Sequence, residues 1–142
     1  RQVLFESIEE RVEASQRLRF DLCVFRDLCR DGAERLAAAN ASVAMVQPLR
    51  RFALEFRDVA YQLLRHSDRE LFDRFLEIIQ TWGADALDDT PDRVQRVRED
   101  CRRFAEVLER AVENVSKRAD LKDRPLDERQ VREALARRLS AV

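Results

Sequence analysis

A seven-residue hydrophobic rhythm through residues 91–118 restricts the fold of this chain more than any other feature. The segment is preceded by Thr90, a strong helix N-cap, and begins with Pro91, which suits a first helical turn. The apolar positions are separated alternately by three and four residues, which places them on one helix face and not on a strand. They are Val94, Val97, Cys101, Phe104, Leu108, Ala111 and Val115. The pattern predicts a long amphipathic helix whose apolar face is covered by another helix or by another chain.

Four further segments carry helical stripes. A capping box is predicted at residues 67–70, with Ser67 as N-cap and Gly83 as the stop of the helix that follows, and Asp127 is predicted to cap the last helix. The stripes are Phe5, Ile8, Val12, Leu18, Leu22, Phe25 and Cys29; Met45, Leu49, Phe52, Phe56, Val59 and Leu63; Leu71, Phe75, Ile78 and Trp82; and Val131, Leu135 and Leu139. Each of the four predicts one helix.

Two positions leave the helix boundaries open. At Gly32 the first helix either ends or continues, since a glycine within a helix costs only about 1 kcal/mol relative to alanine. At Pro48 the second helix either starts, with proline in its first turn, or kinks after an earlier start near Ser42.

Composition agrees with helices throughout. The 142 residues include only two Gly and three Pro, too few for the many tight turns of an all-β fold. Charged residues make up 39% of the chain at a net charge of -1, as on the outer faces of long helices. We predict an all-α, antiparallel bundle of about five helices, four main ones and a short C-terminal one. It forms a single domain over residues 1–142, with residues 119–127 as the linker to the last helix.

The origin and compartment of the protein are predicted from composition alone. All but two of the 27 Lys and Arg residues are Arg, which indicates a GC-rich, bacterial genome; the alternative is selection of Arg for contacts to carboxylates or phosphates. Three cysteines without a CxxC pair favour a reducing, cytoplasmic setting. A helical pattern that begins at once, without an initiator Met, predicts a piece of a longer protein.

Chemical motifs are scarce. There is one histidine, His66, and no Glu-x-x-His pattern, so no carboxylate-bridged metal site is predicted. His66 is expected to lie exposed at a helix C-terminus. The two glycines are far apart, so no phosphate-binding glycine loop exists. We therefore predict no catalytic, cofactor-binding or metal-binding residue, no cofactor, and no enzymatic activity.

The remaining class of function is protein–protein interaction or self-association, as in a signalling, adaptor or secretion module. The candidate interface residues lie on the residue 91–118 helix and on the wide apolar arc of the first helix: Val94, Val97, Phe104, Leu108, Phe20 and Val24. One alternative is a nucleic-acid accessory domain that contacts phosphates through Arg96, Arg103 and Arg110. Another is a helical sensor or ligand-binding bundle. No segment is long and apolar enough to predict a membrane span.

Overall fold

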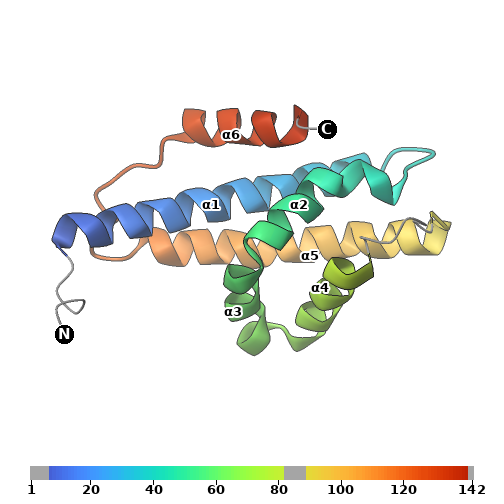
Figure 1. The fold of residues 1–142 in the computed structure, drawn as a ribbon, viewed down its shortest axis with the longest axis horizontal. Helices are drawn as coiled ribbons and strands as arrows, with labels where there is room; N and C mark the ends of the chain where they lie inside the picture. Colours follow the sequence, from blue (N-terminus) through green and yellow to red (C-terminus); the bar gives the residue numbers. More distant parts are fainter. Residues whose placement is uncertain (1–6, 82–88, 141–142) are drawn as a thin grey trace.

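The computed structural model of this protein describes residues 7–81 and 89–140, and every regular element in those ranges is helical (Figure 1). The predicted all-α class is therefore confirmed. The first residue of the first stripe, Phe5, and the predicted stop at Gly83 lie outside the described residues, as does Trp82. In sequence order the elements are α1 (Ile8–Arg35), the short 3-10 helix η2 (Val43–Val46), α2 (Gln47–Glu55), α3 (Arg57–Ser67), α4 (Arg69–Thr81), α5 (Pro91–Ser116) and α6 (Glu128–Ser140).

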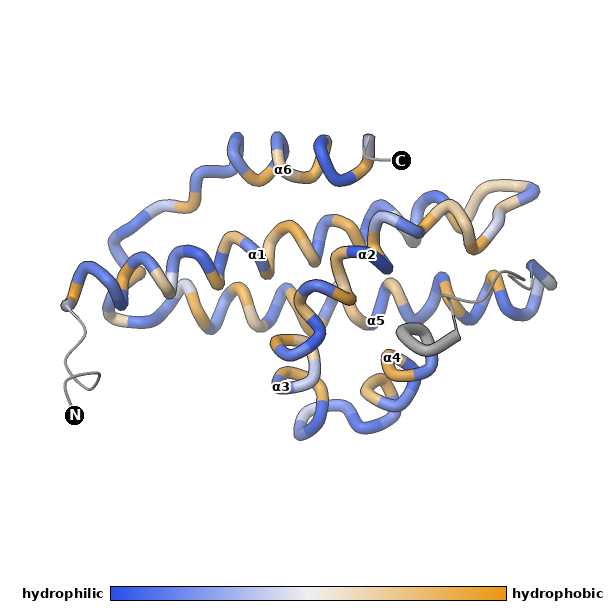
Figure 2. The backbone as a smooth tube through the Cα atoms, in the orientation of Figure 1, coloured by the Kyte–Doolittle hydropathy of each residue, from blue (hydrophilic) through white to orange (hydrophobic). Residues whose placement is uncertain are grey.

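Two long helices, α1 and α5, form the centre of the bundle. They run antiparallel and side by side, α6 lies along α1 on the side away from α5, and the α2–α4 segment extends over the pair (Figure 1). Hydrophobic and hydrophilic residues alternate along both long helices in Figure 2, as expected for helices that bury one face. The arrangement is the predicted antiparallel bundle.

Local capping signals set the starts of three helices. The Thr90 hydroxyl accepts a hydrogen bond from the backbone N–H of Arg93 at 3.4 Å, and the Asp127 carboxylate accepts one from that of Gln130 at 3.2 Å, as predicted. The predicted capping box at Ser67 is wrong by one residue. Ser67 ends α3, where its hydroxyl donates to the carbonyl oxygen of Leu63. The cap of α4 is Asp68, whose carboxylate accepts a hydrogen bond from the backbone N–H of Leu71 at 3.0 Å, because Ser67 still belongs to the last turn of α3.

Helix α1 continues through Gly32 to Arg35, which resolves the first open alternative. Gly32 is buried where three elements meet. A Cβ atom on Gly32 would lie 3.0 Å from Cγ1 of Val46 and 3.5 Å from Sγ of Cys101. The glycine therefore permits the close approach of α1 to its neighbours, at the cost of some helix propensity.

Replacing Gly32 by valine is expected to lower the free energy of unfolding by about 1–3 kcal/mol, since the new methyl groups overlap Val46 and force the packed helices apart. Urea denaturation followed by circular dichroism measures the change. The double variant Gly32→Val/Val46→Ala is expected to recover part of the loss. Equal losses in the single and double variants would show that Val46 is not the limiting contact.

The stripe from Met45 to Leu63 does not form one helix, so the expected count of five becomes six in the described residues. Helix α2 starts at Gln47 with Pro48 in its first turn, and the helix breaks at Phe56, where φ is -112° and ψ is 25°. The break changes which residues are buried: in α3 they are Ala60 and Leu64, each one residue beyond the predicted stripe position. Packing of α3 against α4 overrides the continuous helical pattern.

A series of aromatic rings fills the core between these elements. Phe25 of α1 lies 5.2 Å from Phe52 of α2 and 5.0 Å from Phe104 of α5, measured between ring centroids. Phe104 is in turn 5.1 Å from Phe75 of α4, whose ring is 5.8 Å from that of Tyr61 in α3. One ring from each of five helices therefore joins the core, at separations where aromatic pairs add to simple burial.

Candidate functional site

A groove of about 630 Å³ separates α6 from α1 and from the end of α2. Helix α6 is held over it by few contacts. Arg138 forms an ion pair with Glu55, with 3.2 Å between Nη2 and Oε1, and its guanidinium lies 4.8 Å above the Phe52 ring. Val131 and Ala134 are the residues of α6 that are buried. Only one narrow face of α6 is packed, so the groove beside it stays open.

The floor of the groove is apolar. Phe20 and Val24 reach it from α1, and Phe52 and Phe56 reach it from the end of α2, with the two α2 rings stacked 4.4 Å apart. Val24 and Phe52 are fully buried, whereas Phe20 and Phe56 are only partly covered. The floor therefore still has apolar surface to offer a ligand.

Charged side chains line the groove above this floor. On α1, Arg17 pairs with Asp21 at 3.7 Å, and the Arg17 side chain is 80% exposed. Glu13, Asp127 and Arg137 are exposed at the edges. Both charge signs are therefore present at the rim, where solvent screens them.

One charged residue of the groove is buried. Arg19 of α1 is only 4% exposed, and its Nε atom is fully buried without a hydrogen-bond partner in the described residues. It was not predicted as a site residue. The available signal was its position, seven residues after Val12 and three before Leu22, both on the buried face of α1. An arginine at such a position is a charge where the helical pattern requires an apolar residue.

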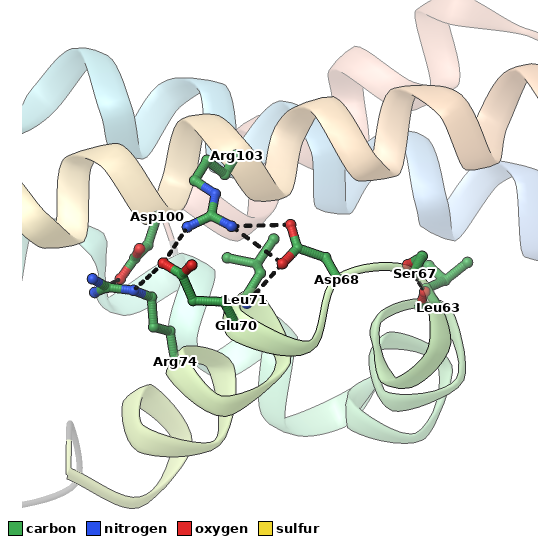
Figure 3. A network of polar contacts seen from close by, with 8 residues as sticks. All are labelled: Leu63, Ser67, Asp68, Glu70, Leu71, Arg74, Asp100 and Arg103. Carbon is green, nitrogen blue, oxygen red and sulfur yellow. Dashed lines mark hydrogen bonds and ion pairs between the residues drawn. The ribbon is translucent and has the colours of Figure 1, made fainter.

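A second polar cluster joins α4 to α5 (Figure 3). Arg103 of α5 donates to both carboxylate oxygens of Asp68, at 3.1 and 3.0 Å, and to Glu70 at 3.1 Å. Beside it, Arg74 of α4 pairs with the buried Asp100 of α5 at 3.3 Å. These contacts run between two helices of the same protein, so the cluster serves to dock α4 on α5.

The pKa values of the two aspartates in this cluster are shifted in opposite directions. The backbone N–H of Leu71 and the Arg103 guanidinium hold the pKa of Asp68 below its ordinary value of 3.8. Burial raises the pKa of Asp100 above 3.8, partly offset by Arg74. Asp68 therefore stabilises the fold above pH 3.8, and that contribution is lost as the pH falls through its folded pKa. For Asp100, stability falls as the pH rises from 3.8 through the folded pKa.

Replacing Asp68 by alanine is expected to lower the free energy of unfolding by about 1–2 kcal/mol at pH 7, because α4 loses its N-cap. The neighbouring Ser67→Ala change is the matched control, and we expect it to be close to neutral. The difference between Asp68→Ala and the unmodified protein should shrink as the pH falls below 3.8. Urea denaturation at several pH values measures both effects. A larger loss for Ser67→Ala than for Asp68→Ala would restore the predicted capping box.

The candidate interface residues separate into two groups. On α5, Val97, Phe104 and Leu108 are buried in the core of the bundle, and Val94 packs partly buried against it. These residues are therefore covered by the protein's own helices. On α1, by contrast, Phe20 and Val24 both line the open groove.

The three candidate anion contacts are not equivalent. Arg103 is held by Asp68 and Glu70 and does not pair with Glu99, which lies one turn before it and contacts Arg102 instead. Arg96 and Arg110 are exposed on α5. Of the three, Arg103 would have to leave its carboxylate partners to reach a phosphate.

The histidine and the three cysteines lie apart from the groove. His66 is exposed in the last turn of α3, as predicted. Cys23, Cys29 and Cys101 are free and buried, and burial raises the pKa of Cys101 to about 12, so its thiol is inert at neutral pH. Within residues 7–81 and 89–140 no group of three or more His, Cys, Asp or Glu residues is placed to hold a metal ion.

Among the described helices, none has the length and apolar character needed to cross a membrane. Comparison with protein-family models, with curated proteins and with solved structures found no match to this sequence. The fold and the groove thus define its class: an all-helical bundle with an open, partly apolar groove.

Proposed function

We propose that this protein is a non-enzymatic helical module that binds a segment of a partner protein in the groove between α1 and α6. The observation that carries the proposal is the contrast between two apolar surfaces. The seam of α5, the apolar stripe that includes Val97, Phe104 and Leu108, is buried in the protein's own core. In the groove, by contrast, Phe20 and Phe56 are only partly covered. Partner binding is therefore supported at the groove and not at the α5 seam.

The dimensions of the groove suit a short peptide. Its volume of about 630 Å³ falls within the range of ligand sites, which is roughly 300–1,000 Å³. Its α1 wall runs from Glu13 to Val24, about 16 Å at 1.5 Å per residue. An extended segment of about five residues has the same length, at about 3.3 Å per residue. The lining combines apolar, amide, carboxylate and guanidinium groups, which provide contacts for side chains and backbone alike.

Selection of peptides from a random display library against the immobilised protein tests the proposal, followed by affinity measurement on the selected sequences. We expect Phe20→Glu to weaken their binding by about tenfold or more, because it places a charge on the apolar floor. Arg137→Glu, at the exposed rim, is a second variant that leaves the core intact and should weaken binding less. The matched control is Arg110→Glu, an exposed arginine of α5 away from the groove, which should bind as the unmodified protein does.

Several outcomes would overturn the proposal. If neither Phe20→Glu nor Arg137→Glu changes the affinity of the selected peptides, they bind to another surface. If no sequence in the library is enriched, peptide binding in the groove is excluded. A dimer detected by light scattering and dissociated by Phe20→Glu would make the occupant a second copy of this protein. Salt-sensitive binding of duplex DNA, abolished in Arg96→Glu/Arg110→Glu, would favour the nucleic-acid alternative.

A further inference from the structure

We infer that Arg19 anchors the occupant of the groove by binding a carboxylate, from an Asp or Glu side chain or from the C-terminus of a polypeptide. The inference rests on the proposed function, because it names the group that the partner segment presents. It starts from the burial of Arg19, which is 4% exposed and lines the groove. Its Nε atom lies fully buried without a hydrogen-bond partner among the described residues, and none of the ion pairs between those residues includes Arg19.

Arg26, two turns further along α1, is an arginine whose guanidinium is paired with carboxylates. Its Nε lies 3.0 Å from Asp27 and its Nη1 lies 2.8 Å from Glu109, although its side chain is more exposed, at 15%. The more deeply buried Arg19 lacks equivalent contacts within residues 7–81 and 89–140. A buried cation is costly unless an anion accompanies it, so the site at Arg19 calls for a negative charge.

The surroundings of Arg19 determine which anion fits. Of the other three arginines that line the groove, Arg17 pairs with Asp21 and Arg138 with Glu55, and Arg137 is exposed at the edge. Of the four arginines that line the groove, Arg19 alone is buried, so a phosphate dianion there would set two charges against one buried guanidinium. Glu13 and Asp127 at the edges would repel its two charges more strongly than the single charge of a carboxylate. A carboxylate carries one charge and matches the planar fork of one guanidinium.

The apolar floor restricts the ligand further. Phe20 follows Arg19 directly in α1, and Val24 lies one turn beyond it on the groove. A ligand whose carboxylate reaches Arg19 therefore places its neighbouring groups against apolar surface. The recognised feature is an acidic residue, or a C-terminal carboxylate, next to apolar side chains.

Nuclear magnetic resonance of the arginine Nε–H groups in isotopically labelled protein tests carboxylate binding at Arg19 without any peptide. Acetate is the probe, with chloride at the same ionic strength as the control and inorganic phosphate as the competing chemistry. We expect acetate to shift the Arg19 Nε–H resonance saturably, while that of Arg17 moves little. A resonance that responds equally to chloride would overturn the inference, and a stronger response to phosphate would overturn the choice of carboxylate.

Peptides selected on the protein provide the second test. Replacing their acidic residue by the matching amide, or amidating the C-terminus, should weaken binding about tenfold or more to the unmodified protein. In Arg19→Met, and in Arg19→Gln as a second variant, the acidic and amide peptides should bind equally. Arg17→Met is the matched control and should keep the preference for the acidic peptide.

The two tests separate the inference from the proposed function. Peptides that bind in the groove with equal affinity in their acidic and amide forms would overturn the role of Arg19 and leave the groove as the binding site. An acetate response at Arg19 without any groove-binding peptide would support the carboxylate site and overturn the proposed protein partner.

Discussion

Replacing Phe104 by alanine is expected to lower the free energy of unfolding by about 3–5 kcal/mol, as for other buried Phe-to-Ala changes. Phe104 is 5% exposed, and its ring lies between those of Phe25 and Phe75, at centroid distances of 5.0 and 5.1 Å. The change removes contacts to α1 and to α4 together and leaves a cavity where these helices meet α5. Urea denaturation measures the loss.

The same variant distinguishes an internal core from an oligomer seam. Because the seam is buried within one bundle, Phe104→Ala should destabilise the protein at every concentration, and Val94→Ala, at the partly buried start of the same seam, should cost much less. If the seam joined two copies, the variant would instead remain folded and lose mass in light scattering. A folded, dissociated Phe104→Ala protein would contradict the burial of this residue within a single copy.

Replacing Arg19 by methionine is expected to raise the free energy of unfolding by about 1–3 kcal/mol in a buffer free of carboxylates. Methionine keeps the apolar stem of the side chain and removes a buried charge that the described residues do not compensate. Arg17→Met, on the exposed side of the same helix turn, should change stability by less than about 0.5 kcal/mol. Thermal and urea denaturation of both variants provide the comparison.

A loss of stability in Arg19→Met would show that the guanidinium is held by the fold itself, and Arg19 would then be a structural residue. The expected gain has a functional meaning, because residues kept for binding are often not optimal for stability. Addition of acetate should stabilise the unmodified protein and leave Arg19→Met unchanged, since a ligand raises stability only where it binds the folded state.

Only some residues of the candidate site could be predicted from the sequence. Phe20 and Val24 could be selected because they widen the apolar arc of α1 beyond what one neighbouring helix covers. Phe52 and Phe56 belonged to a predicted stripe, but their place in the groove depends on the break after α2. Arg19 was one of 25 arginines in the sequence; its position on the apolar face of α1 was a signal, but the structure was needed to show that its Nε atom is buried without a partner among the described residues.

Sequence alone determined the helical class and the helix starts at Thr90 and Asp127. Hydrophobic periodicity and capping act over about four residues, so the information they need lies within each segment. The tertiary structure decided the break at Phe56, the partners of Arg103 and the burial of Arg19. Each of these features depends on which distant segment packs alongside. The break at Phe56 and the partners of Arg103 depend on α4, and the burial of Arg19 depends on the helices that pack around α1. Local pattern therefore specified the helices, and long-range packing specified the groove.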